Sequence, residues 1–152
     1  MKTNKPERLG DILPRVLDGM EKRVPKDSLV YLASPYSHPD PSAREARFQT
    51  ACMAAAHLMR HGALVFSPIA HTHPIAQYDL PKDWQFWKRY DMVMLAACDE
   101  LYVLTLMGWE NSVGVKAEIN IMREADKPVR FFDVCGTVCF EHTKGWVKSY
   151  GK

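Results

Sequence analysis

The chain has 152 residues, of which 47% are hydrophobic and 25% charged, and its formal net charge is +2. This length fits one globular domain with a substantial core. The small net charge argues against binding of nucleic-acid polymers or membrane surfaces by bulk electrostatics, and no apolar run is long enough to span a bilayer. The N-terminus lacks the apolar core of a signal peptide, so we expect a cytoplasmic protein whose four cysteines are reduced.

The first elements are predicted from apolar spacing. Residues 9–20 carry apolar side chains at helical intervals, so we predict a helical extension over residues 1–27. A single domain is predicted over residues 28–152. Its first strand is Leu29–Ala33, an almost wholly apolar run that ends in the polar loop SPYSHPDPS.

A long helix and a second strand come next. The helix is predicted from about Ser42, as its N-cap, to His61, with Gly62 as its stop. The second strand is predicted at Ala63–Ser67. Residues 68–83 contain three prolines and are predicted to form a loop of about sixteen residues, which is longer than a structural connection normally requires.

The second half of the chain repeats the alternation of helix and strand. A helix is predicted from Asp83 to about Cys98, followed by a strand in residues 100–106. The stretch from Gly108 to Val129 supplies a loop and another helix, and Pro128–Val134 a fourth strand. The tail, Cys135–Lys152, is weakly patterned and has room for a short strand or helix.

Strands that alternate with helices indicate βαβ units and therefore a parallel sheet. We predict an α/β fold, a three-layer α/β/α sandwich with a Rossmann- or flavodoxin-like parallel sheet of four to five strands. The unusual polar loops all follow strands, so they should converge at the carboxyl edge of the sheet, where ligands bind in such folds.

Asp91 is a carboxylate on an apolar helix face. Trp84, Trp87 and Met94 lie on the same face at helical spacing. Burying a charged carboxylate is costly unless it is paired or protonated, and burial raises its pKa, which suits a general acid. The alternative is an ion pair with a nearby base such as Lys88.

Glu118 has no local explanation in its predicted helix. Ser112 is a plausible N-cap, but a capping box would place the acidic residue at position 115, which is a valine. The neighbours of Glu118 at helical spacing carry no charge, and Gly114 removes a side chain one turn earlier, where a ligand could approach. The alternative is a solvated surface glutamate.

Other polar residues of the loops allow two further interpretations. Metal binding by His38, His71 and His73 is conceivable, but their spacing is not that of a specific ligand set, and we predict no metal. Arg44 and Arg47, with the neighbouring serines, form either an anion cradle or an ordinary helix cap with a solvated face.

Three motifs resemble those of the nucleoside 2-deoxyribosyltransferase superfamily, which includes the 2'-deoxynucleoside 5'-monophosphate N-glycosidases. VYLASP places Tyr31 at the family's tyrosine, and DMVMLAACDELYVL places Asp91 and Asp99 at its two aspartates. NSVGVKAEI matches its serine and glutamate with Ser112 and Glu118, six residues apart. The resemblance covers about residues 29–133 and looks closest to a small bacterial and phage branch.

The resemblance implies an N-glycosidic-bond hydrolase or transferase that acts on 2'-deoxynucleosides or their 5'-monophosphates without a cofactor. Glu118 would attack C1' and form a glycosyl-enzyme, Asp91 would protonate or hydrogen-bond the leaving base, and Tyr31 would orient Glu118. It also implies a homodimer or homotetramer. The residues expected to bind the substrate are Ser34, Tyr36, Ser37, His38, Arg47, His71, Trp87, Ser112 and Gly114.

The chain also departs from this family. The glycosidases have a first loop rich in glycine and arginine, whereas this chain has SPYSHPDPSAR, and EIN stands where E-L-G is usual. Two other functions therefore stay open: a catalytically silent nucleotide-binding or sensor module of the same fold, and a metal-dependent enzyme that uses the loop histidines.

Overall fold

A five-stranded sheet forms the centre of the protein in the computed structural model, which describes residues 27–132 and 140–142. The strand order is β2-β1-β3-β4-β5, which is the flavodoxin-like order. The first four strands run parallel and β5 runs antiparallel to β4. The strands are β1 (Leu29–Ala33), β2 (Leu64–Phe66), β3 (Glu100–Leu104), β4 (Val129–Phe132) and β5 (Phe140–His142). The predicted α/β fold is confirmed; the predicted N-terminal extension and most of the predicted tail lie outside the described residues.

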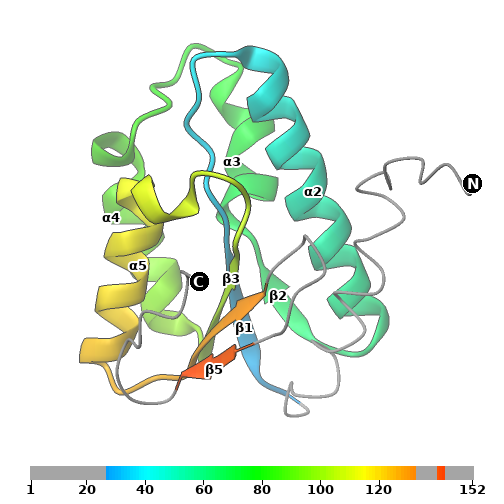
Figure 1. Ribbon diagram of the computed structural model, residues 1–152, viewed down its shortest axis with the longest axis vertical. Coiled ribbons are helices and arrows are strands. Elements are labelled where there is room, and N and C mark those ends of the chain that lie inside the picture. The colour runs from blue at the N-terminus through cyan, green and yellow to red at the C-terminus, as the bar shows by residue number, and fades with distance from the viewer. Residues whose placement is uncertain (1–26, 133–139, 143–152) are drawn as a thin grey trace, which may run out of the picture.

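Helices cover both faces of this sheet, so the predicted three layers are present (Figure 1). The helices are α2 (Pro41–Arg60), α3 (Pro68–Ala76), α4 (Trp84–Ala97) and α5 (Val113–Glu124), with a short 3-10 turn at Trp109–Asn111. The two faces of β1 explain the layers. Val30 and Leu32 pack in the cluster that includes α2, whereas Tyr31 and Ala33 pack in the cluster that includes α4 and α5. Alternate residues of one strand thus anchor opposite layers.

The structure moves several predicted boundaries by one or two residues. Helix α2 begins at Pro41, one residue earlier than predicted, because its N-cap is Asp40 rather than Ser42. Asp40 accepts a hydrogen bond from the Ser42 amide at 2.9 Å. The helix ends at Arg60, and Gly62 follows with φ of 89°, the left-handed conformation that glycine adopts most readily. Strand β2 is also shorter than predicted.

The predicted loop over residues 68–83 is wrong in its first half, which forms helix α3. Ser67 caps this helix by accepting a hydrogen bond from the Ala70 amide at 3.2 Å, and Pro68 occupies the first turn, where proline is tolerated. Pro74 lies in the last turn of the helix, so the backbone hydrogen bond that it cannot donate is lost near the helix end. Prolines at these two positions are therefore compatible with a short helix.

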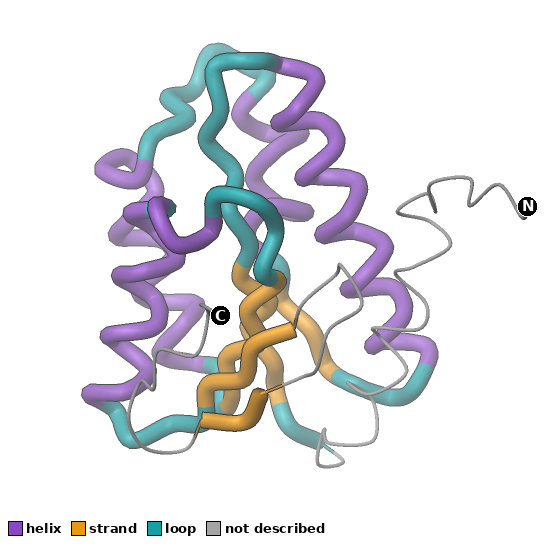
Figure 2. Tube along the Cα trace, viewed as in Figure 1, coloured by secondary structure: helices purple, strands orange, loops and turns teal. Residues whose placement is uncertain are grey.

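The loops that follow β1 and β3 run between the two helical layers at the carboxyl end of the sheet (Figure 2).

Within the described ranges, none of the helices combines the length and apolar character needed to cross a membrane.

Candidate active site

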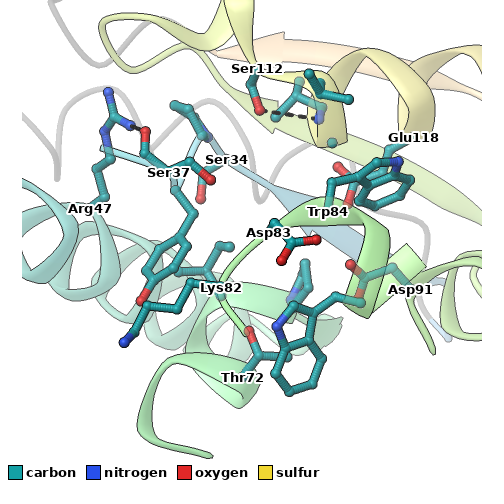
Figure 3. Close-up of a pocket in the computed structure, with 18 of the residues that line it drawn as sticks. Ser34, Ser37, Arg47, Thr72, Lys82, Asp83, Trp84, Asp91, Ser112 and Glu118 are labelled. Carbon is teal, nitrogen blue, oxygen red and sulfur yellow. Dashed lines mark hydrogen bonds between the residues drawn. The ribbon is translucent and has the colours of Figure 1, made fainter. Parts of the chain in front are cut away.

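A pocket of about 630 Å³ lies where the loops after β1 and β3 meet helices α3, α4 and α5 (Figure 3). Its position at the carboxyl edge of a parallel sheet is the one expected for a ligand site in this class of fold. Many of the residues predicted for the site line it: Ser34, Tyr36, Ser37, Arg47, Trp87, Asp91, Ser112, Gly114 and Glu118.

Glu118 lies in the wall of this pocket and is held by Tyr31 beneath it. The Tyr31 hydroxyl donates a 2.7 Å hydrogen bond to Glu118 Oε1, and Tyr31 is fully buried. The predicted N-cap is present, since Ser112 Oγ accepts from the Val115 amide and starts the helix that carries Glu118. Glu118 is only 5% exposed. The alternative of a solvated surface glutamate is therefore wrong.

Burial controls the ionisation of this pair. It raises the pKa of Glu118 to about 8, against the lowering effect of the Tyr31 hydrogen bond and with a further raising effect from Asp91. Burial and the two neighbouring carboxyls raise the pKa of Tyr31 well above its ordinary value. Tyr31 therefore keeps its proton near neutral pH and remains a donor to Glu118.

Asp91 reaches the same pocket from α4. It is 6% exposed, and its Oδ1 atom is buried without a hydrogen-bond partner in the described part of the chain. Burial raises its pKa to about 7. The alternative ion pair with Lys88 is not formed, and Lys88 is exposed. Asp91 is thus a carboxyl group that can hold or release a proton near neutrality, as a general acid requires.

The opposite side of the pocket carries positive charge and hydroxyl groups. Figure 3 shows Arg47 and Lys82 across the pocket from Asp91 and Glu118. Ser34 lies in the same pocket, and its buried Oγ has no hydrogen-bond partner among the described residues. Unpartnered buried polar atoms are costly, so Ser34 and Asp91 are both groups that a bound ligand would satisfy.

Arg44 and Arg47 both donate to backbone carbonyl groups of the loops, whereas the sequence left open an anion cradle or an ordinary helix cap with a solvated face. Arg47 donates to the carbonyl oxygens of Ser37 at 2.8 Å and Met107 at 2.9 Å, and so joins the loop after β1 to the loop after β3. Arg44 donates to the carbonyl oxygens of His38 and Pro39. Both guanidinium groups therefore hold the loops in place, and only Arg47 also lines the pocket.

Two tryptophans of α4 form an aromatic wall. Trp84 lies against Gly114, and a Cβ atom at that glycine would be 3.3 Å from Trp84 Cε3. The space next to Gly114, which we expected a ligand to use, is thus occupied by the indole of Trp84. Trp87 donates from Nε1 to the Pro81 carbonyl at 2.8 Å, and this bond fixes the second indole.

Some predicted residues lie elsewhere. His38 is exposed and its Nδ1 accepts from the Asp40 amide, and His71 stacks on Tyr90 with ring centroids 5.6 Å apart. Neither lines the pocket. Asp99 accepts from the Leu29 amide at 2.8 Å, at the start of β1 and far along the strand from the pocket. Over the described ranges, no three His, Cys, Asp or Glu side chains gather as metal ligands would.

The sequence predicted that the stretch after β2 reaches this edge of the sheet, but it did not reveal helix α3 or which residues of the stretch line the pocket. Thr72, Lys82 and Asp83 line the pocket, but they fall in the stretch that was predicted to be a loop. The Ser67–Pro68 pair was the available signal, because serine followed by proline is a common start of a helix.

The fold is that of an α/β protein, and its pocket at the edge of the parallel sheet contains the two buried carboxyl groups of Asp91 and Glu118. Residues 28–133 match the family described as Domain of unknown function (DUF1937), and the chain belongs to that family. The match begins at the predicted start of the domain and spans every residue of the pocket. No curated protein matches the chain.

Proposed function

We propose that the protein cleaves or transfers the N-glycosidic bond of 2'-deoxynucleosides or their 5'-monophosphates. The observation that carries this proposal is the buried Glu118, hydrogen-bonded by Tyr31 and sharing its pocket with the unpartnered Asp91. Two buried carboxyl groups in one pocket are the components of glycoside chemistry, in which one acts as nucleophile and the other as acid, and the raised pKa of Asp91 suits the acid.

The proposed reaction begins when an ionised Glu118 oxygen bonds to C1' of the sugar. The bond from C1' to the base nitrogen breaks, its electron pair stays with the base, and Asp91 supplies a proton to the departing base. Water or a second base then attacks C1' and releases Glu118, while the ionised Asp91 takes back a proton. Hydrolysis and base exchange thus differ only in the second acceptor.

Other residues of the pocket suit the parts of such a substrate. The indoles of Trp84 and Trp87 offer apolar faces on which a nucleobase can stack. Ser34 and Ser37 offer hydroxyl groups for the sugar, and Lys82 offers a positive charge on the side of the pocket away from the carboxyls. These features support a ligand with an aromatic base at one end and polar groups at the other.

One observation favours a second candidate, a nucleotide-binding module without catalytic activity. With a pKa of about 8, Glu118 is largely protonated at neutral pH, and a protonated carboxyl is a hydrogen-bond donor and not a nucleophile. The two candidates differ in what happens to a bound nucleoside. The enzyme releases or exchanges the base, whereas the module leaves the substrate intact.

Incubation with a panel of 2'-deoxynucleosides and their 5'-monophosphates, followed by chromatography for free base, separates the two candidates. We expect base release by the wild type, loss of release in Glu118→Gln, and normal release in Glu124→Gln, which changes an exposed glutamate of the same helix. Exchange is tested by adding a second free base. Binding without base release for the whole panel would support the module and refute the enzyme.

A further inference from the structure

A hydrogen-bonded chain of three side chains lies behind one wall of the pocket. Tyr36 comes from the loop after β1, His73 from α3 and Glu45 from α2. The Tyr36 hydroxyl oxygen is 2.7 Å from His73 Nδ1, and His73 Nε2 is 3.0 Å from Glu45 Oε2. Of the three, only Tyr36 lines the pocket. From its sequence context alone, His73 was expected to be a loop histidine.

The chemistry of Glu45 fixes the direction of this chain for a neutral His73 ring. Hydrogen bonds from Gln49 and His73 lower the pKa of Glu45, so this carboxylate is ionised and can only accept. His73 Nε2 must then carry the hydrogen. In the neutral imidazole, Nδ1 has a lone pair and accepts the hydroxyl proton of Tyr36. Partial burial raises the pKa of Tyr36, which keeps this proton in place.

Packing holds the middle of the chain rigid. The imidazole of His73 stacks on Phe48 with ring centroids 4.2 Å apart and an interplanar angle of 20°, and its side chain is only 12% exposed. Gln49 donates to Glu45 Oε1 at 2.8 Å and orients the carboxylate. A histidine fixed on both sides in this way cannot turn its ring without breaking two hydrogen bonds.

We propose that His73 and Glu45 are positioning residues that make Tyr36 a hydrogen-bond acceptor toward the ligand. The hydroxyl proton is committed to His73, so only an oxygen lone pair remains for a ligand group near Tyr36. This wall therefore selects a ligand group that donates, a hydroxyl or an amine, over an anionic oxygen at the same point. The inference concerns recognition and does not depend on whether the pocket cleaves a glycosidic bond.

Nitrogen NMR of the full-length protein labelled at its histidines tests the chain without any ligand. We expect the His73 ring to be the Nε2–H tautomer with an unprotonated, hydrogen-bonded Nδ1, and Tyr36→Phe to shift the Nδ1 resonance. His73→Asn assigns the signal. His71→Asn is the matched control on the same helix, because His71 lies outside the pocket, and it should leave the His73 signal unchanged. A proton on Nδ1, in either the Nδ1–H tautomer or the imidazolium form, would overturn the proposal.

Affinity measurements test the acceptor role. The probes are 2'-deoxyadenosine and its 5'-monophosphate, titrated into Glu118→Gln protein so that turnover does not interfere. We expect Tyr36→Phe to weaken the tighter probe by about five- to tenfold, the value of one hydrogen bond, and His73→Ala to act to the same degree without adding to it.

The conservative variant His73→Asn should recover most of the affinity, because the asparagine side-chain oxygen occupies the region of Nδ1 and accepts from Tyr36. Unchanged affinity in Tyr36→Phe, or fully additive losses in the double variant, would overturn the acceptor role. Failure of every 2'-deoxynucleoside and 5'-monophosphate of the panel to bind would instead refute the proposed function, since the tautomer of His73 is measured without them.

Discussion

Replacement of Glu118 by glutamine should make the folded protein more resistant to rising pH. An ordinary glutamate in the unfolded chain loses its proton near pH 4.5, whereas Glu118 in the fold has a pKa of about 8. Between these values the folded state holds a proton that the unfolded state lacks. The free energy of unfolding therefore falls as pH rises, by about 1.4 kcal/mol per pH unit for one such carboxyl.

Asp91 adds a second contribution of the same sign. Its pKa is raised from 3.8 to about 7, so it also holds an extra proton in the folded state over most of this range. From pH 5 to 7 the two carboxyls together should lower the free energy of unfolding by up to roughly 5 kcal/mol, about half of it from each. Glutamine has no proton to lose, and its side-chain oxygen still accepts from Tyr31. Glu118→Gln should therefore halve the slope.

Urea unfolding followed by tryptophan fluorescence at pH 5, 6 and 7 measures this slope directly. The control is Glu124→Gln, which changes an exposed glutamate of the same helix and should keep the wild-type slope. An equal slope in wild type and Glu118→Gln would refute the reasoning, because it would mean that Glu118 ionises in the fold as it does in water.

Three further outcomes follow from the pocket. Tyr31→Phe removes the donor to Glu118, so the pKa of Glu118 should rise further. Because Asp91 has the lower pKa of the two, the alkaline limb of the base-release profile should move up by about one pH unit and the maximal rate should fall about tenfold; an unmoved alkaline limb contradicts the role of Tyr31. The rate of base release should depend on pH as a bell centred between about pH 7 and 8, because the reaction needs Glu118 ionised and Asp91 protonated. At this optimum only roughly one-twentieth of the enzyme molecules hold both groups in the required state. A rate that still rises above pH 9 contradicts this assignment. Gly114→Ala places a methyl group 3.3 Å from Trp84 and should displace its indole in the pocket, so KM should rise several-fold and the tryptophan emission should shift. An unchanged emission spectrum shows that Trp84 does not lie against residue 114.

Local pattern was enough to predict the sheet and the two carboxyls. The apolar run Leu29–Ala33 is a buried central strand because both of its faces pack against helices. Asp91 stood out because it lies on an apolar helix face, and Glu118 because no neighbour at helical spacing pairs with it; both are buried. In both cases an acidic residue that did not fit its local pattern indicated burial.

The partners of these residues depend on contacts distant in sequence. Tyr31 and Glu118 are 87 positions apart, and only the resemblance to a family paired them. Arg47 bonds a carbonyl 60 positions away, and no local signal separates such a clamp from an anion ligand. Helix α3 was missed because its prolines resemble loop residues, and His73 was therefore taken as a loop histidine. Tertiary packing decided each of these points.

The most direct test of the central claim is a search for a covalent glycosyl-enzyme on Glu118. The protein is mixed with a nucleoside or nucleotide from which it releases the base, and the mixture is quenched in acid, digested and analysed by mass spectrometry. We predict one deoxyribosyl group on the peptide that contains Glu118, absent from Glu118→Gln and present in Glu124→Gln. Base release by Glu118→Gln at the wild-type rate, with no adduct in any peptide, would contradict the account.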